Sequence, residues 1–260
     1  MSNEKSETAI SEKKNTSVAV PSAFLDDANS GLETLTADDI TIPRLKVLQA
    51  MSPEVMKSDS KYIEGASAGD IINTVTSKLY TDDKPLVVLP VAYKRLFLEW
   101  GPRESGGGLV AQHEDASILS KTSKDNMGRD MLENGNYIQT SATHFVLSIH
   151  EDGSYDTAMI AMAGTQLKKS RTWNSVMASI KMKSGDKVFT PASFSHKYIM
   201  KTKAESNDRG TWFGWNITLD GPIAESEMSL YEAAKGFAST VGDVNISQPT
   251  DTDASTEAPF

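Results

Sequence analysis

Residues 193–221 read "SFSHKYIMKTKAESNDRGTWFGWNITLDG", and this stretch decides the fold class. In its first half, apolar Tyr198 and Met200 alternate with lysines, which is typical of a β-strand with one buried and one exposed face. After the turn-forming "SNDRG", the side chains from Phe213 to Leu219 alternate in the same way. The pattern predicts two consecutive strands that share an apolar face.

Two other stretches extend this β-rich pattern. Residues 69–100 hold two apolar runs separated by "TDDKP", which predicts a strand pair, and residues 143–164 hold two runs joined by Asp152-Gly153, which predicts a short hairpin. Amphipathic helical periodicity is found at 165–183 and 226–241. We therefore expect a β-rich α+β domain over 36–241.

The ends of the chain differ from this middle. Residues 1–35 are polar and without a sustained period, and residues 242–260 are polar and acidic, so we expect a disordered N-terminal arm and a disordered acidic tail. The overall apolar fraction of 38% agrees with a folded middle between such ends. The chain has no cysteine, no signal peptide pattern and no long apolar run, which predicts a cytoplasmic protein without a membrane partner.

The charge is segregated along the chain. The net charge is −9, yet residues 164–203 hold nine basic side chains and one acidic side chain, Asp186. Such a segment suits a phosphate backbone, although exposed lysines on any strand or helix could also produce it. The candidate phosphate-binding residues are Lys168, Lys169, Arg171, Lys181, Lys183, Lys197, Lys201, Lys203 and Arg209.

A single-strand-binding surface also needs aromatic rings on which bases can stack. Trp212 lies on the polar face of its predicted strand and close to Arg209, so it is the first candidate. Tyr93 and Phe97 share one face of another strand with Arg95 and form a second candidate set. Trp100, close to Arg103, is a further candidate. The aromatic residues that fall on apolar faces and are expected in the core are Trp173, Phe194, Tyr198, Phe213 and Trp215.

The histidines do not predict catalysis. "HED" occurs at 113–115 and again at 150–152, but neighbouring residues on a strand point in opposite directions and rarely converge on one ion. No nucleophile motif or phosphate-binding glycine loop is present. We expect no metal, no cofactor and no enzymatic activity.

The chain ends in "DTDASTEAPF". This ending resembles the acidic tips of bacterial single-stranded DNA-binding proteins and of the phage replication proteins of that type. The resemblance implies an OB-fold core that coats single strands, and a tail that recruits replication or recombination proteins. The partner-binding residues that it implies are Asp251, Asp253, Glu257, Pro259 and Phe260.

The combined prediction is a phage single-stranded DNA-binding protein without sequence preference, able to form homo-oligomers. Its expected fold is an OB-like barrel elaborated by the two helices. Two alternatives remain open: a strand-annealing recombinase, and a structural or interaction protein of the virion that binds no nucleic acid.

Overall fold

The structure is a computed structural model that describes residues 21–28, 30–34, 41–102, 106–208 and 210–241 of the chain. The chain separates into two units, Met1–Ile40 and Thr41–Phe260. In the first unit the structure describes one short helix, α1 (Ser22–Asp26), within the predicted N-terminal arm. Pro21 precedes this helix, and its carbonyl oxygen accepts a hydrogen bond of 3.0 Å from the amide of Phe24.

The second unit is β-rich, and its fold is α+β, as the sequence predicted. A small sheet has the order β1-β2-β3, and a hairpin pairs β10 with β11. The main sheet has the order β13-β12-β4-β8-β7-β6, with β5 paired to β4 and β9 paired to β8. The strands are β1 (Leu45–Val47), β2 (Ile71–Asn73), β3 (Leu79–Tyr80), β4 (Leu86–Trp100), β5 (Leu109–His113), β6 (Ser123–Lys124), β7 (Asp130–Met131), β8 (Tyr137–Ile149), β9 (Tyr155–Ala163), β10 (Met182–Ser184), β11 (Lys187–Phe189), β12 (His196–Asn207) and β13 (Gly210–Pro222).

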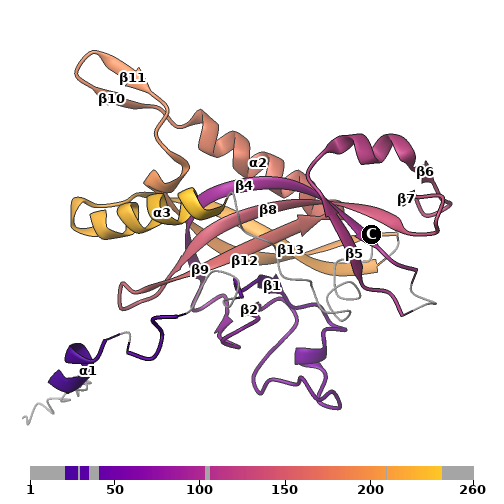
Figure 1. The fold of residues 1–260 in the computed structure, drawn as a ribbon, viewed down its shortest axis with the longest axis horizontal. Coiled ribbons are helices and arrows are strands. Elements are labelled where there is room, and N and C mark those ends of the chain that lie inside the picture. The colour runs from indigo at the N-terminus through magenta and orange to yellow at the C-terminus, as the bar shows by residue number, and fades with distance from the viewer. Residues whose placement is uncertain (1–20, 29, 35–40, 103–105, 209, 242–260) are drawn as a thin grey trace, which may run out of the picture. The chain divides into compact units, whose positions relative to one another are not determined.

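The antiparallel ladder between β4 and β8 is the centre of the main sheet. It runs from Val87↔Ile149 to Trp100↔Tyr137, and its register shifts between Pro90 and Ala92. Proline cannot donate to a ladder, so a bulge beside Pro90 lets this residue occupy a central strand. The long strands twist and curl into a half-barrel in Figure 1.

One predicted hairpin and one predicted pair of consecutive strands are confirmed. β8 and β9 pair from Ser141↔Ala163 to Ile149↔Tyr155, and Gly153 in their turn has a φ of 82°, which favours glycine. β12 and β13 pair over their whole length from His196 to Asn207. Tyr198 and Met200 are buried, so the predicted apolar face of β12 is also confirmed.

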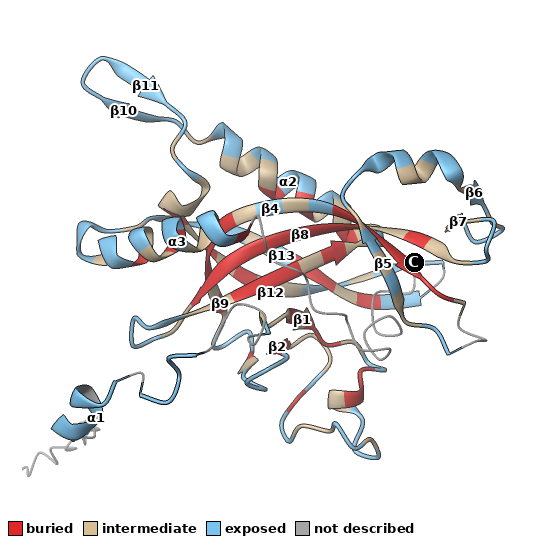
Figure 2. Cartoon of the chain, viewed as in Figure 1, coloured by how far each residue is buried: buried red, intermediate tan, exposed pale blue. Residues whose placement is uncertain are grey.

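Helices cover both faces of the central strands. α2 (Leu167–Ser179) packs with β8 side chains such as Ala142 and Val146, while α3 (Met228–Thr240) packs with Leu147 through Leu230. Alternate residues of β8 thus face opposite helices. The small sheet lies on the α2 side, where Leu45 and Val47 join the same core cluster. Figure 2 shows the resulting continuous burial along β8.

Short 3-10 helices occupy several connections. They are η2 (Pro53–Val55), η4 (Ala116–Lys121), η5 (Gly164–Gln166), η6 (Ser193–Ser195) and η7 (Glu225–Glu227). η5 leads directly into α2, and η7 leads directly into α3.

Two expectations about elements are wrong. The runs around "TDDKP" do not pair with each other, because β3 pairs with β2 and the much longer β4 pairs with β5, β8 and β12. The helix predicted over 165–183 ends at Ser179. Its last predicted turn is replaced by the exposed hairpin β10–β11, which projects beyond the end of α2 in Figure 1.

Candidate nucleic-acid interface

The outer surface of α2 carries exposed cations. Trp173 and Ser170 are the buried residues of this helix, which leaves Lys168 and Arg171 exposed. Across the part of the chain that the structure describes, neither of these two cations has an ion-pair partner. Lys168 and Arg171 are therefore available to an anionic ligand.

The inner side of α2 is anchored by an aromatic stack. Trp173 stacks on His144 of β8, with ring centroids 4.4 Å apart and an angle of 27° between the ring planes. His144 Nε2 lies 2.8 Å from Ser170 Oγ. Burial lowers the pKa of His144 to about 3, because the charged imidazolium is not solvated there. This histidine is a core residue that fixes α2 on the sheet.

A groove separates α2 from the edge strand β13, and we call it the α2 groove. Its volume is about 690 Å³. Lys168, Thr172 and Val176 of α2 are among its lining residues, and those on β13 are Trp215, Asn216, Ile217, Thr218 and Leu219. Trp173 and Tyr198 also line it, and neither the indole N–H nor the phenol hydroxyl has a hydrogen-bond partner among the described residues. Two buried donors thus lie beside a space that could hold an acceptor.

Side-chain amides occupy part of the β13 edge. The amide of Gln49 both accepts from Phe213 N and donates to Phe213 O, at 2.9 Å each, and Gln166 Oε1 accepts from Trp215 N at 2.9 Å. The backbone groups of Phe213 and Trp215 therefore point away from β12. In an antiparallel pair, every second residue directs its backbone N–H and C=O away from the partner strand. The backbone groups of Ile217 and Leu219 therefore also point to the outer edge of β13.

Lys169 is not available in the same way as Lys168. Its Nζ lies 2.6 Å from Glu205 Oε1, and Glu205 Oε2 accepts a bond of 3.1 Å from the indole N–H of Trp212. Burial acts to raise the pKa of Glu205, but the bond to Lys169 and its positive charge lower the pKa overall. The carboxylate remains charged and holds both partners.

Trp212 is consequently buried, with 6% of its surface exposed, and the expectation that it lies open on a polar face is wrong. Phe97 is also buried, with 3% of its surface exposed. Tyr93 is 39% exposed and Arg95 is exposed as well. The Tyr93 ring lies 5.0 Å from His144, next to the base of α2. Of the predicted aromatic residues, only Tyr93 offers an accessible ring.

The lysines of β12 lie opposite its buried face, as predicted, but two of the three are engaged. Lys197 Nζ contacts both carboxylate oxygens of Glu227 at 2.8 and 3.0 Å. Lys201 Nζ donates to the carbonyl oxygen of Asp82 at 3.0 Å and lies 3.8 Å from its carboxylate. Lys203 is exposed and has no ion-pair partner among the described residues.

Lys181 and Lys183 lie on the hairpin β10–β11 and its approach, where sequence reasoning had placed a helix. Every residue from 181 to 190 is exposed. Lys181 Nζ donates to the carbonyl of Ala178 and to the Thr190 hydroxyl, whereas Lys183 and Lys187 have no ion-pair partner in the described ranges. The two-residue loop Gly185-Asp186, with a Gly185 φ of 58°, is a hairpin signal that sequence reasoning missed.

Other candidate residues lie outside the described residues. They are Arg209 and the partner-binding set Asp251, Asp253, Glu257, Pro259 and Phe260. Their predicted roles remain predictions.

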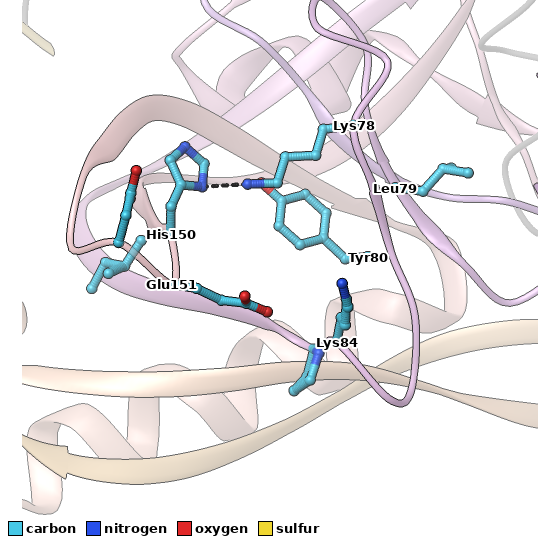
Figure 3. A pocket seen from close by; sticks show the side chains of 9 residues that line it. Lys78, Leu79, Tyr80, Lys84, His150 and Glu151 are labelled. Carbon is cyan, nitrogen blue, oxygen red and sulfur yellow. Dashed lines mark hydrogen bonds between the residues drawn. The ribbon is translucent and has the colours of Figure 1, made fainter. Parts of the chain in front are cut away.

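A second pocket, of about 440 Å³, lies between β3 and the start of the β8–β9 turn (Figure 3). His150 Nδ1 lies 2.7 Å from Lys78 Nζ, and His150 Nε2 lies 2.8 Å from Asp156 Oδ2. Figure 3 shows Lys84 and Glu151 reaching into the same space. Because charges of both signs line it and several already pair, this pocket offers no uniform field for a polyanion.

The two "HED" sequences do not meet. His113 Nε2 lies 2.9 Å from Glu99 Oε2, at a different part of the main sheet from His150. No group of three or more potential metal ligands is found within the described residues. No helix in the same part of the chain has the length and apolar character needed to cross a membrane.

Comparison with known proteins gives one result. No curated protein and no solved structure matches the chain. A family model described as "Pam3 phage gp34-like protein" matches residues 12–247, which includes all of the main sheet and both long helices. The chain therefore belongs to the Pam3 phage gp34-like protein family.

Proposed function

We propose that this phage protein binds single-stranded DNA without sequence preference and serves phage replication or recombination as a non-enzymatic coating protein. The observation that carries the proposal is the set of exposed cations on consecutive elements α2, β10 and β11. Lys168, Arg171, Lys183 and Lys187 are exposed and have no ion-pair partner among the described residues. Because these elements follow one another, they provide a path for a phosphate backbone.

The α2 groove supports the same proposal. It runs beside Lys168 and is lined by hydrogen-bonding groups of β13, such as the side chains of Asn216 and Thr218. Unstacked bases present donors and acceptors that paired bases hide, so a groove of this kind suits a single strand. The curled antiparallel sheet is the part of the fold that favours an OB-like relationship.

The test is an electrophoretic shift of a labelled single strand and of the matching duplex, repeated over a range of salt concentrations. We expect preferential binding of the single strand, and weaker binding as salt rises. Equal affinity for both forms, or no binding at low salt, contradicts the proposal. The second result favours the virion alternative.

Strand annealing is tested separately, because it would use the same cations. The rate of pairing between complementary strands is measured with and without the protein, and the complexes are imaged in negative stain. Faster pairing together with rings or filaments identifies an annealing recombinase. Uniform coating without faster pairing supports the proposed role.

Recruitment of replication or recombination proteins is proposed for the acidic segment 242–260. A variant lacking residues 251–260 should bind DNA with equal or higher affinity, because fewer acidic side chains compete for the cations. The same variant should no longer retain host or phage replication proteins in a pull-down from infected cells. A collapse of DNA affinity contradicts this role of the segment.

A further inference from the structure

The hairpin β10–β11 exposes apolar side chains that the rest of the fold does not cover. Met182 and Phe189 form a directly opposed cross-strand pair. Their exposed fractions are 39% and 37%, and that of Val188 on the other face is 62%. A hairpin of three residue pairs is only marginally stable alone. Exposure of the Phe189 ring to water is unfavourable, and a ligand that covers the ring would remove this cost.

The charges around this ring are almost all positive. Lys181, Lys183 and Lys187 flank or lie within the two strands, and Asp186 in the loop is the one acidic residue between positions 180 and 190. A positively charged ribbon with an exposed aromatic ring has the two components that single-strand binding requires, a path for phosphates and a stacking surface. A basic or apolar protein partner would not use these lysines.

We propose that β10–β11 is a DNA-binding arm in which Phe189 stacks on a base of the single strand. This inference rests on the proposed function and assigns the stacking role to a residue that sequence reasoning did not select. It also explains how the protein could stack bases although Trp212 is buried beside Glu205.

The geometry of the ribbon assigns roles to its other residues. Lys187 and Phe189 lie on the same face, because they are two positions apart on β11, and side chains so placed are about 6.6 Å apart. A base on Phe189 therefore leaves a neighbouring phosphate within reach of Lys187. Met182, directly opposite Phe189, extends the apolar surface beneath the base. Val188 points to the other face and is expected to contribute nothing to stacking.

The test compares two substitutions at one position. Phe189→Leu keeps an apolar side chain and removes the ring, whereas Phe189→Trp keeps a ring. We expect Phe189→Leu to lower the affinity for a short labelled oligothymidylate roughly tenfold, as measured by fluorescence anisotropy. Phe189→Trp should bind at least as tightly as the wild type. The matched control is Val188→Ala, which removes apolar surface from the same strand on the opposite face.

A second measurement identifies the contact directly. An oligothymidylate that carries 5-iodouracil is cross-linked to the wild-type protein by light, and the modified peptide is mapped by mass spectrometry. We expect the cross-link at Phe189. The melting temperature of each variant should equal that of the wild type, because the hairpin is exposed throughout.

Each outcome has a separate meaning. If Phe189→Leu and Phe189→Trp lower the DNA affinity equally, or if the cross-link forms only on other elements, Phe189 does not stack on a base. Single-strand binding itself is not contradicted by either result. Unchanged DNA affinity together with a change of oligomeric state in Phe189→Leu, measured by sedimentation, shows that the hairpin contacts a second copy and also overturns it. If the wild type does not bind the oligothymidylate, the proposed function itself fails.

Discussion

Lysines occur both on β12 and on the segment formed by α2 and the hairpin β10–β11, but their surroundings differ. On β12, Lys197 is held by Glu227 and Lys201 by Asp82. On α2 and the hairpin, Lys168 and Lys183 are exposed and have no ion-pair partner among the described residues. A count of basic residues gives only the number of positive charges in a segment, whereas the acidic residues on neighbouring elements decide which of these charges remain for a ligand.

The largest effect is expected from removing the free cations together. In a variant with Lys168, Arg171, Lys183 and Lys187 all changed to Ala, we expect the single-strand affinity to fall on the order of a hundredfold at low salt. At about 0.7 per phosphate contact, the slope of log affinity against log salt should become shallower by about three. Anisotropy titrations over a salt series measure both quantities.

The control for this variant changes Lys197 and Lys201 to Ala and leaves α2 and the hairpin intact. Its salt slope should equal that of the wild type. If the two variants lose affinity equally, the distinction between held and free lysines is wrong.

The packing of α2 on β8 can be tested by varying the pH, because His144 of β8 contacts Trp173 and Ser170 on the buried side of this helix. Its folded pKa of about 3 lies below the ordinary value of 6.5, so the unfolded chain binds more protons between these values. Stability is therefore retained above pH 6.5 and is lost as pH falls, by about 2 kcal/mol from this group between pH 6.5 and 5. Urea unfolding at several pH values measures this loss.

In His144→Gln we expect the free energy of unfolding to depend less on pH across this window. His196, whose pKa is also lowered by burial, provides the comparison, since it remains in both proteins. An unchanged pH dependence in His144→Gln shows that His144 is not the group that titrates.

A smaller effect is expected at the Lys197–Glu227 pair. Lys197→Met should lower the free energy of unfolding by about 0.5–1 kcal/mol, because partly exposed ion pairs contribute little. Its DNA affinity should stay within about twofold of the wild type, since this lysine is already engaged. Combining it with Glu227→Gln isolates the pair energy, and full additivity of the two substitutions contradicts a coupled pair.

The smallest effect is expected at Lys203, the β12 lysine without an ion-pair partner among the described residues. It lies on the strand face opposite Tyr198 and Met200. Lys203→Ala should change single-strand affinity less than Lys168→Ala does in the same titration. A larger loss at Lys203 moves the DNA path from α2 to the outer face of β12.

The periodicity of apolar residues predicted those elements whose pattern fits only one type of secondary structure. The alternation of β12 and β13, the Asp152-Gly153 hairpin and the two amphipathic helices all correspond to elements of the structure. Pairing between distant strands was not predictable in this way. β4 follows "TDDKP", but its partners β8 and β12 come from far along the chain.

The candidate site was predicted less well, because availability depends on neighbours in space. The residues that alternate with Trp212 on its strand face are polar. In the structure, however, Glu205 lies directly opposite Trp212 on β12 and accepts a hydrogen bond from its indole N–H. Lys169 is adjacent to Lys168 and of the same residue type, but its ammonium group pairs with the carboxylate of Glu205. Only Gly185-Asp186 was a local signal that could have shown the hairpin.

The two glutamine amides on β13 have a consequence for contacts between copies of the protein. An exposed sheet edge is a surface on which the edge strand of a second molecule can pair, so that two sheets join into one. Gln49 and Gln166 take the place of a neighbouring strand at Phe213 and Trp215. Gly214 makes room for this arrangement, because a Cβ atom there would lie 2.8 Å from Gln166 Nε2. The edge is thereby closed to a second copy at Phe213 and Trp215, so neighbouring molecules can pack densely without fusing through this part of β13.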